Sequence, residues 1–188
     1  MESSIQLEPF ISVDVETAGP SPGQYSLLSI GACTISSPPQ TFYVELQPLN
    51  DLMQPEAYAI HELSLEELRQ KGVPPKVAME RFAAWLLDVL PEGLAPIFVA
   101  FNAPFDWSFV NEYFHRYLGR NPFGHAALDI KAFYMGVTGS SWQDTNMRNV
   151  SNQYLAGRNI SHNALEDALD QAKIFRGLLR QARNLPDP

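Results

Sequence analysis

Hydrophobic residues follow one spacing in the first part of the chain and another spacing in the rest. Phe10–Val15 carries β-branched residues in the pattern of a strand, and two more apolar runs follow after short links. Because strands joined by short links usually pair with their neighbours, we expect an antiparallel meander. The three predicted strands are Phe10–Val15, Leu27–Ile35 and Phe42–Leu46.

The later part of the chain changes to helical spacing. Apolar residues recur every third or fourth position in several segments, and short apolar runs between them are typical of buried strands. The predicted elements are helix Pro75–Leu90, strand Ile97–Phe101, helix Pro104–Leu118, a weaker strand Ala126–Ile130, helix Asn146–Leu155 and helix Asn163–Arg183. This order predicts an α/β fold with one mixed sheet and helices packed on its faces.

Composition excludes several classes of protein. The 188 residues have the length of one domain, and the hydrophobic fraction of 45% excludes a disordered acidic tail. A net charge of -8 argues against a general basic nucleic-acid-binding protein and against a polybasic membrane anchor. The single cysteine, Cys33, excludes an intrachain disulfide framework. Without a secretory signal or an apolar run of about 20 residues, a cytoplasmic protein without membrane contact is expected.

Basic residues are confined to one part of the sequence. All 13 Lys and Arg residues lie from Arg69 onward, so residues 1–68 contain no side chain that attracts phosphate through a permanent positive charge. Five later residues are candidates for phosphate contacts, although a solvated surface charge is the simpler interpretation of each one. They are Arg116, Arg120, Lys131, Arg148 and Arg158.

Two acids lie two residues apart on the first predicted strand. Residues at this spacing point to the same face, so Asp14 and Glu16 are expected to lie side by side. Adjacent carboxylates repel each other, and their oxygens suit a hard cation such as Mg²⁺ or Mn²⁺. Two solvated acids on an exposed strand face explain the spacing equally well.

Two later segments carry acids that also have ordinary explanations. Asp106 lies in the first turn of a predicted helix, where the helix dipole favours an acid. That turn follows a buried strand, however, which is where open α/β sheets bind ligands. His162 and Asp167 converge only if His162 lies on the loop before the last helix and Asp167 lies in its second turn. A surface histidine and a separate polar-face aspartate are the alternative.

Together the three segments resemble the DEDDh family of 3′–5′ exonucleases, which have a ribonuclease-H-like fold. The resemblance rests on the Asp-x-Glu strand at Asp14 and Glu16, on the Asn-x-x-Phe-Asp turn that ends at Asp106, and on the His-x-Ala-x-x-Asp segment from His162 to Asp167. The segments occur in the family's order. The resemblance implies a mixed sheet, made of an antiparallel three-strand meander plus parallel strands, with helices on both faces.

Further residues are similar to the ribonuclease T branch. They are the runs from Asp14 to Gly19, from Val99 to Asp106 and from Arg120 to Phe123. The sequence departs from that branch at Pro20, where a bulky stacking residue is usual, and at Phe101, where a histidine is common. The basic residues with which that branch grips RNA near its N-terminus have no counterpart.

The resemblance implies an enzyme that uses divalent metal ions, Mg²⁺ or Mn²⁺, to release 5′-mononucleotides from single-stranded 3′ ends or 3′ overhangs of DNA or RNA. The metal ligands that it implies are Asp14, Glu16, Asp106 and Asp167, with Asp14 bridging two ions about 4 Å apart. His162 is the implied general base. The implied substrate contacts are Thr17, Ala18, Ile60, His61, Asn102 and Phe105.

The resemblance spans residues 10–175, so residues 1–188 are expected to form a single exonuclease domain with its core at about 10–180. Homodimers are common in the ribonuclease T branch. Two other functions stay open: a non-catalytic nucleic-acid-binding or interaction domain, and a nucleotide phosphohydrolase, for which no motif is found. The complete set of four carboxylates and His162 argues against a binding module. The sequence does not distinguish DNA from RNA.

Overall fold

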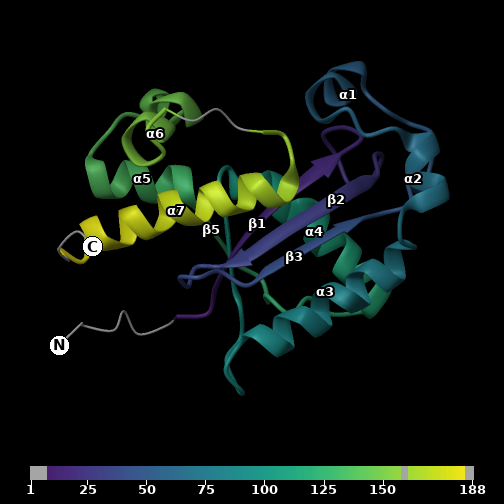
Figure 1. Ribbon diagram of the computed structural model, residues 1–188, viewed down its shortest axis with the longest axis horizontal. Helices are drawn as coiled ribbons and strands as arrows, with labels where there is room; N and C mark the ends of the chain where they lie inside the picture. Colours follow the sequence, from purple (N-terminus) through teal and green to yellow (C-terminus); the bar gives the residue numbers. More distant parts are fainter. Residues whose placement is uncertain (1–7, 158–160, 185–188) are drawn as a thin grey trace.

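A five-stranded mixed sheet forms the centre of the protein (Figure 1). The computed structural model describes residues 8–157 and 161–184. The first three strands form the predicted antiparallel meander, and two parallel strands extend the sheet on the other side of β1. The strand order is β3-β2-β1-β4-β5. The strands are β1 (Phe10–Thr17), β2 (Leu27–Thr34), β3 (Thr41–Glu45), β4 (Ile97–Ala100) and β5 (Ala127–Asp129).

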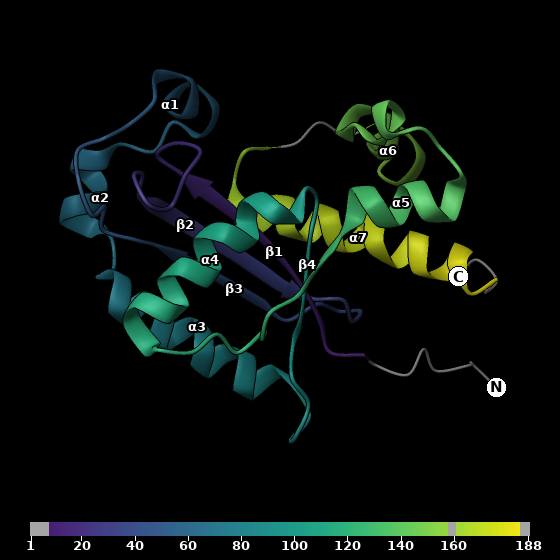
Figure 2. The ribbon, with the colours of Figure 1, turned by 180° about the vertical axis from the view of Figure 1, so that it is seen from behind.

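Helices cover both faces of the sheet, which confirms the predicted α/β architecture (Figures 1 and 2). On one face lie α3 (Pro75–Val89) and α4 (Ala103–Leu118). On the other lies α7 (Ala164–Ala182), accompanied by α5 (Ile130–Thr138), the 3-10 turn η1 (Trp142–Thr145) and α6 (Met147–Tyr154). Two short helices, α1 (Pro55–His61) and α2 (Leu65–Lys71), lie near the C-terminal end of β1.

The strand β1 divides its side chains between these two layers. Ile11, Val13 and Val15 belong to the hydrophobic core that includes residues of α3 and α4. The alternate residues face α7, where the Ser12 hydroxyl donates a hydrogen bond of 2.8 Å to the carbonyl oxygen of Ala168. Since side chains alternate along a strand, Asp14 and Glu16 point toward α7 as well. The apolar residues of β1 therefore anchor the strand in the core, and its polar residues face α7.

The start of α7 lies unusually close to the sheet. A Cβ atom on Gly31 of β2 would lie 2.1 Å from the carbonyl carbon of Ala164, so only glycine fits there. Gly31 is also the β-sheet partner of Asp14. The absence of a side chain on Gly31 therefore allows the first turn of α7 to lie directly beside Asp14.

The strands β1 and β4 separate just before Asp14. Their parallel pairing covers only Phe10–Ser12, opposite Ile97–Val99. Beyond this point α4 begins, and its side chains approach the end of β1. In open α/β sheets, ligands bind at the carboxyl ends of strands where neighbouring connections diverge. The topology thus places Asp14 and Glu16 at the expected position for a site.

Several short elements were missed by the sequence prediction. The helices α1 and α2 have seven residues each, which is too short for a helical repeat of apolar residues to be recognised. The helix α5 contains glycine and β-branched residues, which lower helix propensity, but the Asp129 side chain caps its first turn. None of the helices in the described ranges is long and apolar enough to cross a membrane.

Candidate active site

Three carboxylates from opposite ends of the chain meet on the α7 side of the sheet. Asp14, Glu16 and Asp167 each offer an oxygen atom, and these atoms all lie within 4.8 Å of one another. The first two come from β1, and the third comes from the start of α7. Such a group of hard oxygen donors is suited to a divalent cation such as Mg²⁺ or Mn²⁺.

The fourth predicted acid, Asp106, approaches from the other side of β1. It lies in the first turn of α4 and is buried. Its Oδ1 atom accepts a hydrogen bond of 3.1 Å from the backbone N–H of Val15. Asp106 is outside the group of three, but its charge is near enough to contribute to the raised pKa of Asp14. The structure therefore brings all four acids to one region.

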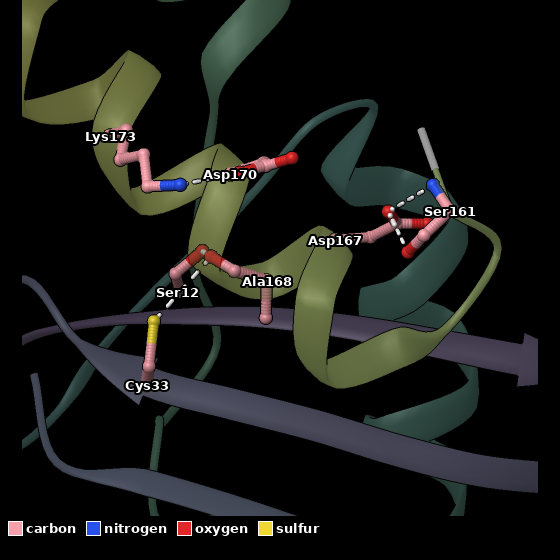
Figure 3. A network of polar contacts seen from close by, with 7 residues as sticks. All are labelled: Ser12, Cys33, Ser161, Asp167, Ala168, Asp170 and Lys173. Carbon is pink, nitrogen blue, oxygen red and sulfur yellow. Dashed lines mark hydrogen bonds and ion pairs between the residues drawn. The ribbon is translucent and has the colours of Figure 1, made fainter. Parts of the chain in front are cut away.

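Asp167 is held by the loop that precedes its own helix. Its Oδ1 atom accepts hydrogen bonds from the backbone N–H and the hydroxyl of Ser161, at 3.0 and 3.1 Å (Figure 3). Its Oδ2 atom accepts a hydrogen bond of 3.1 Å from the backbone N–H of His162. The backbone of His162 adopts a left-handed conformation with φ of 55°. This loop geometry brings His162 and Asp167 together, whereas a continuous helix would separate them.

The site carries more negative charge than its surroundings neutralise. Burial, followed by the charges of Asp106, Glu16 and Asp167, raises the pKa of Asp14 well above its usual value. Burial and the neighbouring acids raise the pKa of Glu16 to about 8, and burial raises that of Asp106 to about 8. The pKa of Asp167 is also raised by burial, although its bonds to Ser161 oppose the shift. Bound cations would relieve this repulsion, so the residues present fit a metal site.

These shifts predict how stability depends on pH in the absence of metal. The pKa values of Glu16 and Asp106 are about 8 in the folded protein, against about 4 for unfolded carboxyl groups. The folded state therefore binds more protons in this interval, and the free energy of unfolding falls as pH rises from about 4 to about 8. Thermal unfolding in EDTA should show this fall, with about 2–4 °C lost for each kcal/mol.

Adding Mn²⁺ should raise the unfolding temperature much more near pH 8 than near pH 5, because protons occupy the ligands at the lower pH. Glu16→Gln removes one of the titrating groups, so this variant should show a weaker pH dependence in EDTA. A metal effect of equal size at both pH values would contradict the assignment of these groups as metal ligands.

Two residues that support the site were missed in the sequence. Gln171 of α7 is buried, and its Nε2 atom donates a hydrogen bond of 2.6 Å to Asp14 Oδ1. Its Oε1 atom accepts the backbone N–H of Phe101 at 2.9 Å, so the amide is fixed with its NH₂ group toward Asp14. Nothing in the local sequence marks Gln171, because a glutamine on a helix has no distinctive spacing.

The second missed residue is Asp129, at the end of β5. Its Oδ1 atom accepts the backbone N–H groups of Asn102 and Ala103, at 2.9 and 3.1 Å. Its Oδ2 atom accepts the N–H of Ala132 at 3.1 Å and so caps α5. Asn102 has a left-handed backbone with φ of 68°, and this turn directs α4 and Asp106 toward β1. An aspartate between a strand and a helix is a typical N-cap, and this signal could have identified Asp129.

Replacing Asp129 with Ala is expected to reduce hydrolytic activity by about 10- to 100-fold, the usual effect of removing a group that orients a metal ligand. Loss of the N-cap should also reduce stability by about 1 kcal/mol. Asp88→Ala, on the exposed surface of α3, is the matched control. Activity and thermal unfolding of both variants test the prediction, and unchanged activity in Asp129→Ala would contradict it.

The predicted substrate contacts lie around the end of β1 and the start of α4. Thr17 and Ala18 are buried, and the Thr17 hydroxyl donates to the carbonyl oxygen of Gly19. His61 accepts the Leu63 N–H at Nδ1, so its Nε2–H donates to the carbonyl oxygen of Thr17. Burial lowers the pKa of His61. Both ring nitrogens thus bind backbone groups, and His61 attaches α1 to the end of β1.

The remaining predicted contacts are more accessible. Ile60 of α1 is 50% exposed. Asn102 is exposed at the start of α4, and Phe105 is half-buried with its ring 5.4 Å from that of Phe109. None of these residues belongs to the group of three carboxylates, so a nucleotide contact for each of them stays a prediction.

Comparison with known proteins identifies the family to which this arrangement belongs. The RNase_T family, described as an exonuclease, matches residues 11–175. A curated protein of Escherichia coli, 3′-5′ DNA exonuclease Cap18, is 48% identical over 169 residues, which cover 90% of each protein.

Solved structures share the fold at low sequence identity. The nuclease domain of 3′hExo, a DEDDh family member bound to rAMP, has a TM-score of 0.75 at 14% identity, and the match covers 94% of each chain. Escherichia coli Exonuclease I in complex with a dA16 oligonucleotide has a TM-score of 0.68 at 19% identity, with 93% of this chain and 42% of that chain covered. With the RNase_T match and the Cap18 relative, these findings show that the chain belongs to the DEDDh family of 3′–5′ exonucleases.

Proposed function

We propose that this protein is a divalent-metal-dependent exonuclease that removes 5′-mononucleotides from the 3′ ends of single-stranded DNA, including 3′ overhangs. The observation that carries the proposal is the group of Asp14, Glu16 and Asp167 oxygens within 4.8 Å of one another. The relative at 48% identity is described as a DNA exonuclease, and the Exonuclease I structure contains a DNA oligonucleotide. Both descriptions favour DNA over RNA as the substrate.

Asp14, Glu16, Asp106 and Asp167 would hold two divalent ions. Bound Mg²⁺ or Mn²⁺ would stabilise the charge that develops on the phosphoryl oxygens and on the leaving 3′-oxygen. Hydrogen bonds from other residues of the chain hold two of these carboxylates in position. Gln171 orients Asp14 through its 2.6 Å hydrogen bond, and the Ser161 loop orients Asp167. Hydrogen bonds thus orient Asp14 and Asp167 in the metal-free protein.

His162 is the proposed general base, which takes a proton from the attacking water. Its backbone N–H is bound to Asp167, so the residue lies beside the metal ligands. Its side chain is exposed, and the His162 ring has no hydrogen-bond partner among the described residues. Imidazole is the usual general base near neutral pH.

Digestion of end-labelled nucleic acids tests the proposal. Single-stranded DNA, single-stranded RNA and duplex DNA with a 3′ overhang are compared in Mn²⁺, in Mg²⁺ and in EDTA. With a 5′ label, we expect a ladder of strands that shorten from the 3′ end, a 5′-mononucleotide product, and no reaction in EDTA. The absence of any metal-dependent product would favour a non-catalytic binding domain. Internal cleavage would contradict exonuclease action.

The proposed role of His162 as general base is tested by His162→Ala, which should lower kcat by about 10²- to 10⁴-fold. Metal binding, measured as the rise in unfolding temperature with Mn²⁺, should be unchanged. His125→Ala is the matched control, because His125 is also exposed but lies between α4 and β5. Loss of metal binding in His162→Ala would show that His162 is a metal ligand instead of a base.

A further inference from the structure

We propose that Lys131 and Trp142 form a second contact for the substrate strand, in which a base upstream of the scissile bond stacks on the Trp142 indole and the adjacent phosphate lies near Lys131. The inference rests on the proposed function, because it assigns a binding surface to the same substrate. We refer to these two residues as the Lys–Trp pair.

The Lys–Trp pair places a positive charge over an exposed aromatic ring. Trp142 begins η1 and is 53% exposed, although indole is among the largest apolar side chains. The Lys131 Nζ atom lies 4.5 Å from the centre of the Trp142 ring. Within residues 8–157 and 161–184, Lys131 forms no ion pair with an acid. By contrast, Arg116, another candidate for a phosphate contact, is paired with Glu112 at 3.0 Å.

The pair belongs to the segment made of α5, η1 and α6, which borders the candidate site near Asp129 and at Met147. Lys131 is two residues from Asp129, whose side chain binds the turn at Asn102. On the other side, Met147 begins α6 soon after η1 and lines a cavity of about 110 Å³ that also contains Asp14 and Asp167. The segment therefore contacts the site through Met147 and its neighbouring turn through Asp129, and α5 and α6 lie beside α7 (Figures 1 and 2).

The chemistry of the pair matches a nucleic-acid strand. Aromatic side chains bind single strands by stacking on bases, and this stacking does not depend on base identity. Lys131 lies over one face of the indole, and about half of the Trp142 side chain is exposed, so part of its surface is available to a base. The ammonium group of Lys131 adds a positive charge that can bind a phosphate. Residues 1–68 contain no lysine or arginine that could do so. The pair thus adds a positively charged contact for the strand near the acidic site.

An alternative role is purely structural. A lysine that covers an exposed indole stabilises the local fold through a cation–π interaction, without any ligand. The two roles differ in what they predict for substrates of different length. A structural role affects every substrate alike, whereas a contact upstream of the scissile bond affects only substrates that are long enough to reach it.

The test therefore compares thymidine-5′-p-nitrophenyl phosphate, which has no upstream nucleotides, with oligothymidylates of increasing length. For Trp142→Ala and Lys131→Ala, we expect KM for the longer oligonucleotides to rise about 10-fold, with kcat for the ester unchanged. Trp142→Phe should retain most of the affinity, because phenylalanine also stacks. Lys76→Ala and Leu87→Ala, which change exposed residues of α3 on the opposite face, are the controls.

Binding gives a readout that is independent of hydrolysis. In the Asp14→Asn background, a longer oligothymidylate should quench the fluorescence of Trp142, and this quenching should be absent when Trp142→Phe is added. Equal losses for the ester and for oligonucleotides, or no change with any substrate, would overturn the Lys–Trp contact. If the unmodified protein hydrolyses neither substrate but the quenching occurs, the proposed exonuclease function fails and the strand contact stands.

Discussion

Replacing Asp14 with Asn is expected to abolish metal-dependent hydrolysis while making the metal-free protein more stable. Asp14 contributes an oxygen to the acidic group, and its charge is surrounded by those of Asp106, Glu16 and Asp167. Replacing residues that only orient a metal ligand costs about 10- to 100-fold, so loss of a proposed ligand itself should cost more than 100-fold. Removal of one buried charge from the group also relieves repulsion, which raises the unfolding temperature in EDTA.

Three measurements on Asp14→Asn check this prediction: the rate of ester hydrolysis, the unfolding temperature in EDTA, and the rise in that temperature with Mn²⁺. We expect the first to vanish, the second to increase near pH 8, and the third to shrink. Asp88→Asn, an exposed change on α3, should match the unmodified protein in all three. An active Asp14→Asn protein would rule out the metal site described above.

The second large effect is expected for Gly31→Val. The new Cβ atom would meet the backbone of Ala164 and Leu165 at 2.1 to 2.2 Å, so α7 has to move away from β2. Overpacking usually costs about 1–3 kcal/mol. Movement of α7 also displaces Asp167 and Gln171 from Asp14, and a misplacement of about 1 Å in an active site can cost about 10²-fold in rate.

Gly136→Ala is the matched glycine control, because a Cβ atom at this position of α5 meets nothing within 4 Å. This substitution should leave activity unchanged and stabilise the helix slightly. For Gly31→Val, both the unfolding temperature and the response to Mn²⁺ should fall. A folded Gly31→Val protein with full activity would mean that the close approach of α7 is not needed for the site.

The sequence predicted the sheet because its strands have a strong pattern of apolar residues. The meander and both parallel strands lie within a few residues of their predicted bounds, and the helix expected at Asn163–Arg183 is α7, Ala164–Ala182. The acids were found because their spacing resembles a known family. Backbone contacts between residues that are far apart in the sequence are not marked by any motif. The approach of Ala164 to Gly31, for example, depends on packing that one sequence does not encode in any local pattern.

Two side chains that depart from the ribonuclease T branch, Phe101 and Pro20, lie in different surroundings. Phe101 donates its backbone N–H to Gln171 and lines the cavity that contains Asp14 and Asp167, and its side chain also packs against the core beneath α7. A change of side chain at this position leaves that hydrogen bond intact. Pro20 is exposed just beyond Gly19, so its ring is free of the core. Neither departure disturbs the four carboxylates.

The order in which the chain is synthesised gives the position of Asp167 a biological consequence. Asp14 and Glu16 belong to β1, which is synthesised well before α7, the helix that carries Asp167. A nascent chain that still lacks α7 therefore has neither Asp167 nor Gln171, and it presents only part of the ligand set. The set of four acids is therefore complete only once α7 has been synthesised and has packed against β1 and β2.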